Sequence, residues 1–124
     1  MTIFYVDDDV DDRELVLEVL KEIDPSIYCV TACDGREALE TLAKSPLPDY
    51  IFLDINMPGV DGIEILAYLR REPHLIPISV FVITSDDQPE TRRKVMKLGA
   101  NVMIIKPATI DALEDALKRV RFLK

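Results

Sequence analysis

The chain has 124 residues, a length typical of one domain, and 48 % of them are hydrophobic, which suffices for one buried core. Its formal net charge is −8, because 23 acids outnumber 15 bases. This excess excludes a typical nucleic-acid reader, which needs a basic face to displace phosphate counterions, and it opposes docking on anionic lipid. We therefore expect neither nucleic acid nor a membrane among the partners.

The N-terminal residues lack the features of a targeting segment. Met1 and Thr2 lead straight into an apolar run without the basic residues of a signal peptide, and no apolar run approaches the ~20 residues that cross a bilayer. The two cysteines, Cys29 and Cys33, have no Cys or His neighbours at zinc-site spacing, which predicts two free thiols. These features together predict a cytoplasmic protein.

Five short apolar runs alternate with amphipathic stretches along the chain. The runs are rich in Val, Ile, Phe or Tyr and mostly apolar on both faces, which is typical of parallel strands covered on both sides. We expect strands at Ile3–Val6, Tyr28–Thr31, Tyr50–Leu53, Val80–Ile83 and Val102–Ile105.

The intervening stretches carry apolar residues at helical spacing. These residues are Leu15, Val19, Leu20 and Ile23; Ala38, Leu39 and Leu42; Ile63, Leu66 and Leu69; and Ile110, Leu113, Leu117 and Val120. Gly99 is placed to form a left-handed cap at the end of the fourth helix. A strand–helix unit repeated five times with short connections predicts an α/β fold, an open and doubly wound parallel sheet with right-handed crossovers.

Polar residues follow four of the predicted strands, at the edge where sheets of this kind bind ligands. The segments are Asp7-Asp8-Asp9, Asp54-Ile55-Asn56, Thr84-Ser85 and Lys106-Pro107. Each segment alone has an ordinary explanation, such as a helix cap formed by Asp9 or Asp11, or a solvated lysine. Because the carboxyl ends of parallel strands lie at one edge, we expect the carboxylates, a hydroxyl and an ammonium group to converge there.

Such a convergence favours a metal ion and a phosphoryl group. Asp7, Asp8 and Asp54 held close together would repel one another, and a hard divalent cation such as Mg²⁺ relieves that repulsion. A single histidine and distant thiols make zinc or copper a poor fit. Lys106 and the hydroxyl of Thr84, or a backbone N–H, could hold further phosphoryl oxygens, and an aspartate carboxylate is a competent nucleophile.

These motifs resemble the receiver domain of two-component response regulators, in particular the stand-alone, chemotaxis-regulator-like type. The matching segments occur in the family's order and at its spacing over essentially the whole chain. They are Asp7-Asp8, Asp54-Ile55-Asn56-Met57-Pro58-Gly59-Val60-Asp61-Gly62, Thr84-Ser85 and Lys106-Pro107. The resemblance implies a five-stranded, flavodoxin-like (βα)5 fold with strand order 2-1-3-4-5, and residues 1–124 as a single receiver domain without an output domain.

The resemblance also implies a metal site. Mg²⁺ would be bound by Asp8 directly, by Asp7 through a metal-bound water, by Asp54, and by the backbone carbonyl of Asn56. No other cofactor is implied.

The remaining matches concern phosphoryl transfer. Asp54 would be the phosphoryl acceptor, Thr84 would hydrogen-bond the phosphoryl group, and Lys106 would pair with it. The Lys106–Pro107 bond would be cis, as X–Pro bonds sometimes are in tight turns.

Two positions depart from the family pattern. The family often has an aromatic residue on the fifth strand, three residues before the lysine, whose rotation reports phosphorylation. Met103 stands there, and its flexible thioether could repack as a switch with Thr84. The residue after Thr84 is commonly Ala or Gly, and Ser85 would narrow access to the site slightly.

The implied function is a stand-alone response regulator that takes a phosphoryl group from a histidine kinase, a histidine phosphotransfer protein or a small phosphodonor. It would be no enzyme beyond catalysing its own phosphorylation and dephosphorylation. Its output would pass to an unknown downstream protein through the face of the fourth helix, fifth strand and fifth helix. The basic residues of that helix are Arg92, Arg93, Lys94 and Lys97. A phosphorelay intermediate, a phosphate sink and a pseudo-receiver without chemistry remain alternatives.

Two further classes fit the sequence less well. A haloacid-dehalogenase-type phosphatase also uses an aspartate nucleophile, but it needs a second acid two residues later, where Asn56 stands. A nucleotide- or flavin-binding domain should carry a glycine-rich loop after its first strand. Residues 7–10 are acidic there and would repel phosphate without a metal.

Overall fold

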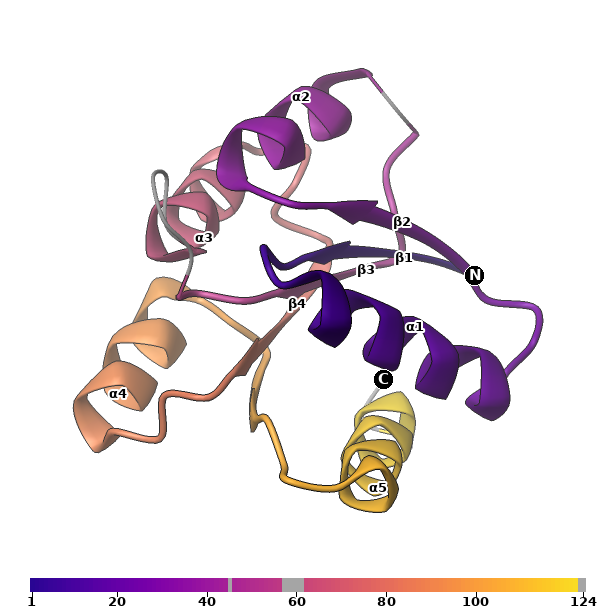
Figure 1. Cartoon of the computed structure of the whole chain (residues 1–124). Helices are drawn as coiled ribbons and strands as arrows, with labels where there is room; N and C mark the ends of the chain where they lie inside the picture. Colours follow the sequence, from indigo (N-terminus) through magenta and orange to yellow (C-terminus); the bar gives the residue numbers. More distant parts are fainter. Residues whose placement is uncertain (45, 57–61, 123–124) are drawn as a thin grey trace.

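A computed structural model describes residues 1–44, 46–56 and 62–122 of the chain, with side chains described as far as residue 119. Strands and helices alternate along it (Figure 1). The strands are β1 (Thr2–Val6), β2 (Tyr28–Ala32), β3 (Tyr50–Leu53), β4 (Ser79–Thr84) and β5 (Val102–Ile105). The helices are α1 (Val10–Ile23), α2 (Gly35–Lys44), α3 (Gly62–Arg71), α4 (Pro89–Leu98) and α5 (Ile110–Phe122).

The strands form one parallel sheet in the order β2-β1-β3-β4-β5, which confirms the predicted doubly wound fold. Three strands are one or two residues longer than the sequence predicts. The difference matters for Thr84, which is the last residue of β4, paired with Ile105, and not a loop residue.

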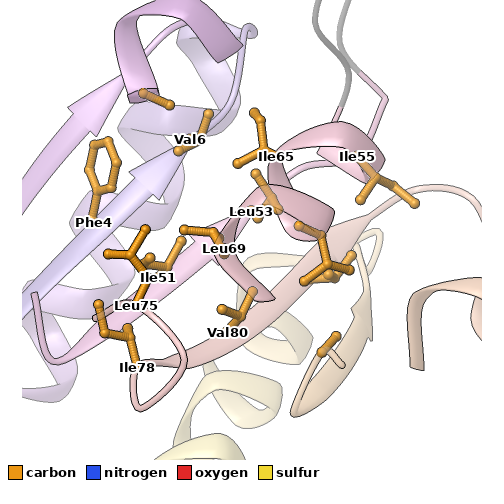
Figure 2. Packing of buried hydrophobic residues seen from close by; sticks show 14 of the residues in the cluster. Phe4, Val6, Ile51, Leu53, Ile55, Ile65, Leu69, Leu75, Ile78 and Val80 are labelled. Atoms are coloured by element: carbon orange, nitrogen blue, oxygen red, sulfur yellow. The ribbon is translucent and has the colours of Figure 1, made fainter. Parts of the chain in front are cut away.

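Helices cover both faces of the sheet (Figure 1). α2, α3 and α4 cover one face, and α1 and α5 cover the other, because each helix buries one apolar stripe. Figure 2 shows the first cluster, in which Leu53 and Val80 of the sheet pack near Ile65 and Leu69 of α3. Burying each such side chain contributes about 1.5–3 kcal/mol relative to exposure, so both faces stabilise the sheet.

Local signals fix the ends of two helices. The Asp9 carboxylate accepts hydrogen bonds from the N–H groups of Asp11 and Asp12 and so caps α1. Gly99 ends α4 with φ of 110°, the left-handed conformation that the sequence predicts. Ile110 departs from the predicted apolar stripe of α5, since it is 53 % exposed at the first position of the helix and burial begins at Leu113.

Candidate functional site

Backbone hydrogen bonds carry the sheet ladder past the strand ends and fix the three principal site residues. The N–H of Asp7 donates to Ala32 O at 3.1 Å, and that of Asp54 donates to Val6 O at 2.9 Å. On the other side of the sheet centre, Lys106 N–H donates to Thr84 O at 2.7 Å. The residues after β1, β3 and β5 therefore project from one edge of the sheet, as the parallel topology requires.

Asp7 is fully buried, and both of its carboxylate oxygens are occupied. Oδ2 accepts from the Tyr5 hydroxyl at 2.5 Å and from Lys106 Nζ at 3.0 Å, and Oδ1 accepts from Asp9 N–H at 3.0 Å. Burial alone would raise the pKa of Asp7, but these hydrogen bonds, with Tyr5 first among them, hold it below its usual value. Asp7 is thus a fixed anion at neutral pH.

Asp54 lies beside Asp7, but its pKa is shifted in the opposite direction. Burial raises the pKa of Asp54 to about 6, although the Asn56 N–H and the Lys106 ammonium oppose that rise. The exposed Asp8 completes the group, and one carboxylate oxygen from each of the three acids lies within 4.8 Å of the others. This arrangement supplies an all-oxygen, anionic donor set, the kind that Mg²⁺ prefers.

Gly62 allows α3 to begin against the backbone of Asp54 and Ile55. Its N–H donates to Ile55 O at 3.3 Å, and a Cβ at this position would overlap Ile55 Cα and Asp54 O. A side chain there would push the start of α3 away from Asp54. The segment 57–61 of the same motif lies outside the described residues.

Lys106 lies between three carboxylates. Its Nζ is 3.0 Å from Asp7 Oδ2, 3.2 Å from Asp54 Oδ2 and 2.8 Å from Asp12 Oδ2. Burial would lower the pKa of Lys106, but the hydrogen bond to Asp12 and the charges of Asp54 and Asp7 raise it above its usual value. The ammonium group is therefore permanently charged and crowded by anions.

Tyr5 and Asp12 were missed by the sequence reasoning, although each had a signal. Tyr5 lies in β1 and Asp7 directly follows it, two residues later, so their side chains leave the chain on the same face. Asp12 belongs to an acidic run in which five of residues 7–12 are aspartates. Neither signal distinguishes a site residue from a core tyrosine or a solvated acid.

Thr84 is fully buried, and its hydroxyl accepts two hydrogen bonds, from Asn56 Nδ2 and from Asp86 N–H, each at 3.1 Å. Asn56 also donates its N–H to Asp54 Oδ1 at 3.0 Å, so it connects Asp54 to Thr84. Because both bonds use the oxygen as acceptor, neither consumes the hydroxyl proton, which can be donated to another group. The Asn56 carbonyl as a metal ligand stays a prediction.

Met103 lies beneath the surface, 7 % exposed, in the apolar cluster that includes Val82 and Val95. It pairs with Val82 in the sheet, two residue pairs before the Thr84–Ile105 pair, and so lies on the same face as Thr84. This proximity is compatible with the switch role, which stays a prediction. Ser85, the second departure, is exposed.

One expectation about the β5–α5 connection is wrong. No peptide bond is cis among the described residues, so the Lys106–Pro107 bond is trans. The trans form is the intrinsic preference of X–Pro bonds, by about 0.5–1 kcal/mol.

The two thiols are free, as predicted. Cys33 follows β2 and donates its S–H to Glu37 Oε2 at 2.9 Å, and this hydrogen bond raises the pKa of the thiol. No described helix is long and apolar enough to span a membrane.

Comparison with known proteins agrees with this geometry. The family model of the response regulator receiver domain matches residues 3–118. Chemotaxis protein CheY-3 of Vibrio cholerae is 32 % identical over 120 residues, which cover 97 % of this chain and 91 % of that protein. A protein-glutamate methylesterase/protein-glutamine glutaminase of a Nocardioides species is 33 % identical over 96 % of this chain, but the match covers only 32 % of that protein. The chain thus spans about a third of this larger relative.

A solved structure extends the agreement to three dimensions. The phosphorylated cyanobacterial phytochrome response regulator RcpA is 32 % identical, with a TM-score of 0.89 and coverage of 97 % of this chain and 90 % of that one. The family match, the strand order and the motif residues at the sheet edge lead to one assignment. The chain belongs to the family of response regulator receiver domains of two-component signalling.

Proposed function

We propose that this chain is a phosphorylation switch in which Asp54 accepts a phosphoryl group beside a bound Mg²⁺ ion. One observation carries the proposal: carboxylate oxygens of Asp7, Asp8 and Asp54 lie within 4.8 Å of one another, and the Lys106 ammonium is 3.2 Å from Asp54. An acidic cluster stabilised by a single cation is suited to a divalent metal and an incoming phosphate. RcpA, the similar structure, is a phosphorylated protein.

The donor set fits Mg²⁺ in chemistry. Asp8 is exposed and offers a carboxylate for direct coordination, whereas both oxygens of Asp7 already accept hydrogen bonds. Asp7 would therefore act through a water, and Asp54 and the Asn56 carbonyl would complete the protein ligands. A bound Mg²⁺ would neutralise charge on the phosphoryl oxygens.

In the transfer step, a carboxylate oxygen of Asp54 attacks phosphorus and forms a new O–P bond. The bond between phosphorus and its donor, a histidine nitrogen or the oxygen of a small acyl phosphate, breaks, and the donor keeps the electron pair. With a pKa of about 6, Asp54 is mostly ionised at neutral pH and can act as the nucleophile. Lys106 and the Thr84 hydroxyl donate to the phosphoryl oxygens.

Receiver domains interact with histidine kinases and downstream effectors, and we assign the donor role to a histidine kinase or histidine phosphotransfer protein. For the output, the face of α4, β5 and α5 is the best candidate. Its basic residues on α4 are all exposed on an otherwise acidic protein, and they are Arg92, Arg93, Lys94 and Lys97. The partner is then acidic or mixed in charge, and its binding weakens with salt. In this proposal the chain catalyses only its own phosphorylation and dephosphorylation.

Acetyl phosphate with Mg²⁺ tests the acceptor. The intact protein should gain the mass of one phosphoryl group, sensitive to hydroxylamine, only when Mg²⁺ is present. Asp54→Asn should abolish the adduct, while Asp87→Asn, an exposed aspartate near the same edge, should be labelled like the parent. Labelling of Asp54→Asn at the parental level would overturn the assignment.

Beryllofluoride, which mimics the phosphoryl group, tests the output face. We expect amide shifts at Met103 and across residues 89–98 of α4. Shifts confined to the loops around Asp54 would mean that no switch is transmitted, and would favour a phosphorelay or phosphate-sink role.

A further inference from the structure

All three N–H donors of the Lys106 ammonium are occupied in the unphosphorylated protein. A lysine ammonium has three N–H donors, and the three carboxylates within 3.2 Å of Nζ match them one to one. Two of these partners, Asp7 and Asp54, belong to the acceptor site itself. The third, Asp12, comes from α1, and its contact of 2.8 Å is the shortest of the three.

The first turn of α1 is fixed in place, so the position of Asp12 is set by the fold. Asp9 caps the helix and accepts from Asp12 N–H at 3.2 Å, and Arg13 Nη1 donates to Asp7 O at 2.7 Å. These bonds join the turn to the end of β1. The Asp12 side chain is 38 % exposed, whereas that of Asp7 is fully buried, so Asp12 is the partner most easily released to water.

Space for that release exists beside the contact. A small cavity of about 40 Å³ between α1 and α5 is lined by Asp12, Lys106 and Pro107. α1 and α5 lie on the same face of the sheet (Figure 1), and Leu113 of α5 closes the cavity. The cavity therefore borders both members of the Asp12–Lys106 ion pair.

We propose that Asp12 is a positioning residue that holds Lys106 toward α1 and competes with the phosphoryl group for it. The inference rests on the proposed function, because it assumes that Lys106 pairs with a phosphoryl group on Asp54. A phosphoryl oxygen that approaches Lys106 displaces one of the three carboxylates, and the anionic Asp12 also repels it. Asp12 thus weakens the phosphorylated state relative to the unmodified one and sets the balance of the switch.

The test is a beryllofluoride titration of the full chain with Mg²⁺, followed by amide shifts, on three variants. Asp12→Asn removes the competing charge and should tighten binding about three- to fivefold, as expected for a partly exposed ion pair. Asp12→Glu keeps the charge and should restore affinity toward the parental value. Asp11→Asn removes the same charge from the same turn and should change affinity less than twofold, since the partner of Lys106 on α1 is Asp12.

The outcomes separate the inference from the function beneath it. If the parent binds beryllofluoride and Asp12→Asn binds equally or more weakly, or no more tightly than Asp11→Asn, Asp12 is not a competitor and the inference is overturned. If the parent itself does not bind, the proposed function fails and the inference fails with it. Melting curves of the variants without ligand show whether folding accounts for any difference, and a tighter Asp12→Asn complex cannot arise from a damaged fold.

Discussion

Two cations lie at opposite ends of β4 and β5 and have opposite surroundings. At the amino ends, the Arg70 guanidinium donates to oxygens that, among the described residues, are all neutral, at 2.8–3.0 Å. These are the carbonyls of Gly99, Ile76 and Ile78 and the side-chain oxygen of Asn101. At the carboxyl ends, the Lys106 ammonium contacts three carboxylates.

The pKa shifts of the two groups have opposite signs for this reason. Burial lowers the pKa of Arg70, with no anion to oppose it, whereas the carboxylates raise the pKa of Lys106 despite burial. Arg70 completes a set of backbone acceptors and adds stability at one end of the sheet. The Lys106 cluster has more negative than positive charge at the other end. A bound metal ion or a phosphoryl group would change this net charge. The Arg70 guanidinium and the Lys106 ammonium thus lie at opposite ends of the sheet in opposite electrostatic surroundings.

The largest effect should come from Arg70→Met. The substitution leaves four acceptors without their charged donor and removes the link between α3 and the turn before β5, so we expect a loss of about 3 kcal/mol in unfolding free energy. Because Arg70 lies at the end of the sheet opposite the acidic cluster, Mg²⁺ should not restore the lost stability.

Chemical denaturation measures the loss, and Arg71→Met is the matched control. Arg71 is exposed, with its guanidinium 6.0 Å from the centre of the Tyr68 ring, and its loss should cost well under 1 kcal/mol. Equal destabilisation by the two substitutions would contradict a special role for Arg70.

The comparison also shows what the sequence can predict. The fold followed from apolar runs such as Tyr50–Leu53, because a strand buried on both faces shows no alternation. The principal site residues followed from topology, since Asp54 and Lys106 each come directly after a parallel strand. Both features can be predicted because they depend only on adjacent residues in the sequence or on the position where a strand ends.

Contacts between distant side chains could not be predicted. Arg70 appears in the sequence only as one of two basic residues ending a helix, while its partners Gly99 and Asn101 are about thirty positions away. Asp12 and Lys106 are 94 positions apart, and only the packing of α1 against the segment after β5 brings them together. Whether a charged residue is solvated or bound depends on that packing, which has no local signal.

A smaller and reversible effect should come from Lys106→Met. Without the ammonium, the buried carboxylates of Asp7 and Asp54 keep their other hydrogen bonds but lose their shared cation, and we expect a loss of about 2 kcal/mol in metal-free buffer. If Mg²⁺ binds the native site as proposed, tenfold excess over its Kd would stabilise the parent by about 1.4 kcal/mol, and it should recover more than this in the variant, whose acidic cluster is more repulsive.

Melting with and without Mg²⁺, at ionic strength matched by a monovalent salt, provides the measurement. Asp8→Ala should diminish the Mg²⁺ shift, because it removes an exposed carboxylate of the cluster. Equal Mg²⁺ shifts in Lys106→Met, Arg70→Met and Asp8→Ala would show that the cation acts nonspecifically, and the contrast between the two ends of the sheet would fail.

The smallest effect should come from the ionisation of Asp54. The pKa of Asp54 is raised from 3.8 to about 6, so its ionised form destabilises the metal-free fold. This destabilisation is fully present above pH 6 and is relieved as the pH falls toward 4. Stability should therefore rise by about 1 kcal/mol between pH 7 and pH 5. Asp7 does not contribute in this window, because its pKa lies below its usual value and its stabilisation is lost only at lower pH.

Asp54→Asn isolates the effect, since the variant keeps His74 and every other acid, and the difference between its pH profile and that of the parent belongs to Asp54. Saturating Mg²⁺ holds the carboxylate ionised and should abolish the rise in the parent. A parent protein that loses stability from pH 7 to pH 5 relative to Asp54→Asn would show that Lys106 already neutralises the Asp54 carboxylate. The carboxyl end of the sheet would then carry no destabilising charge, like the Arg70 end.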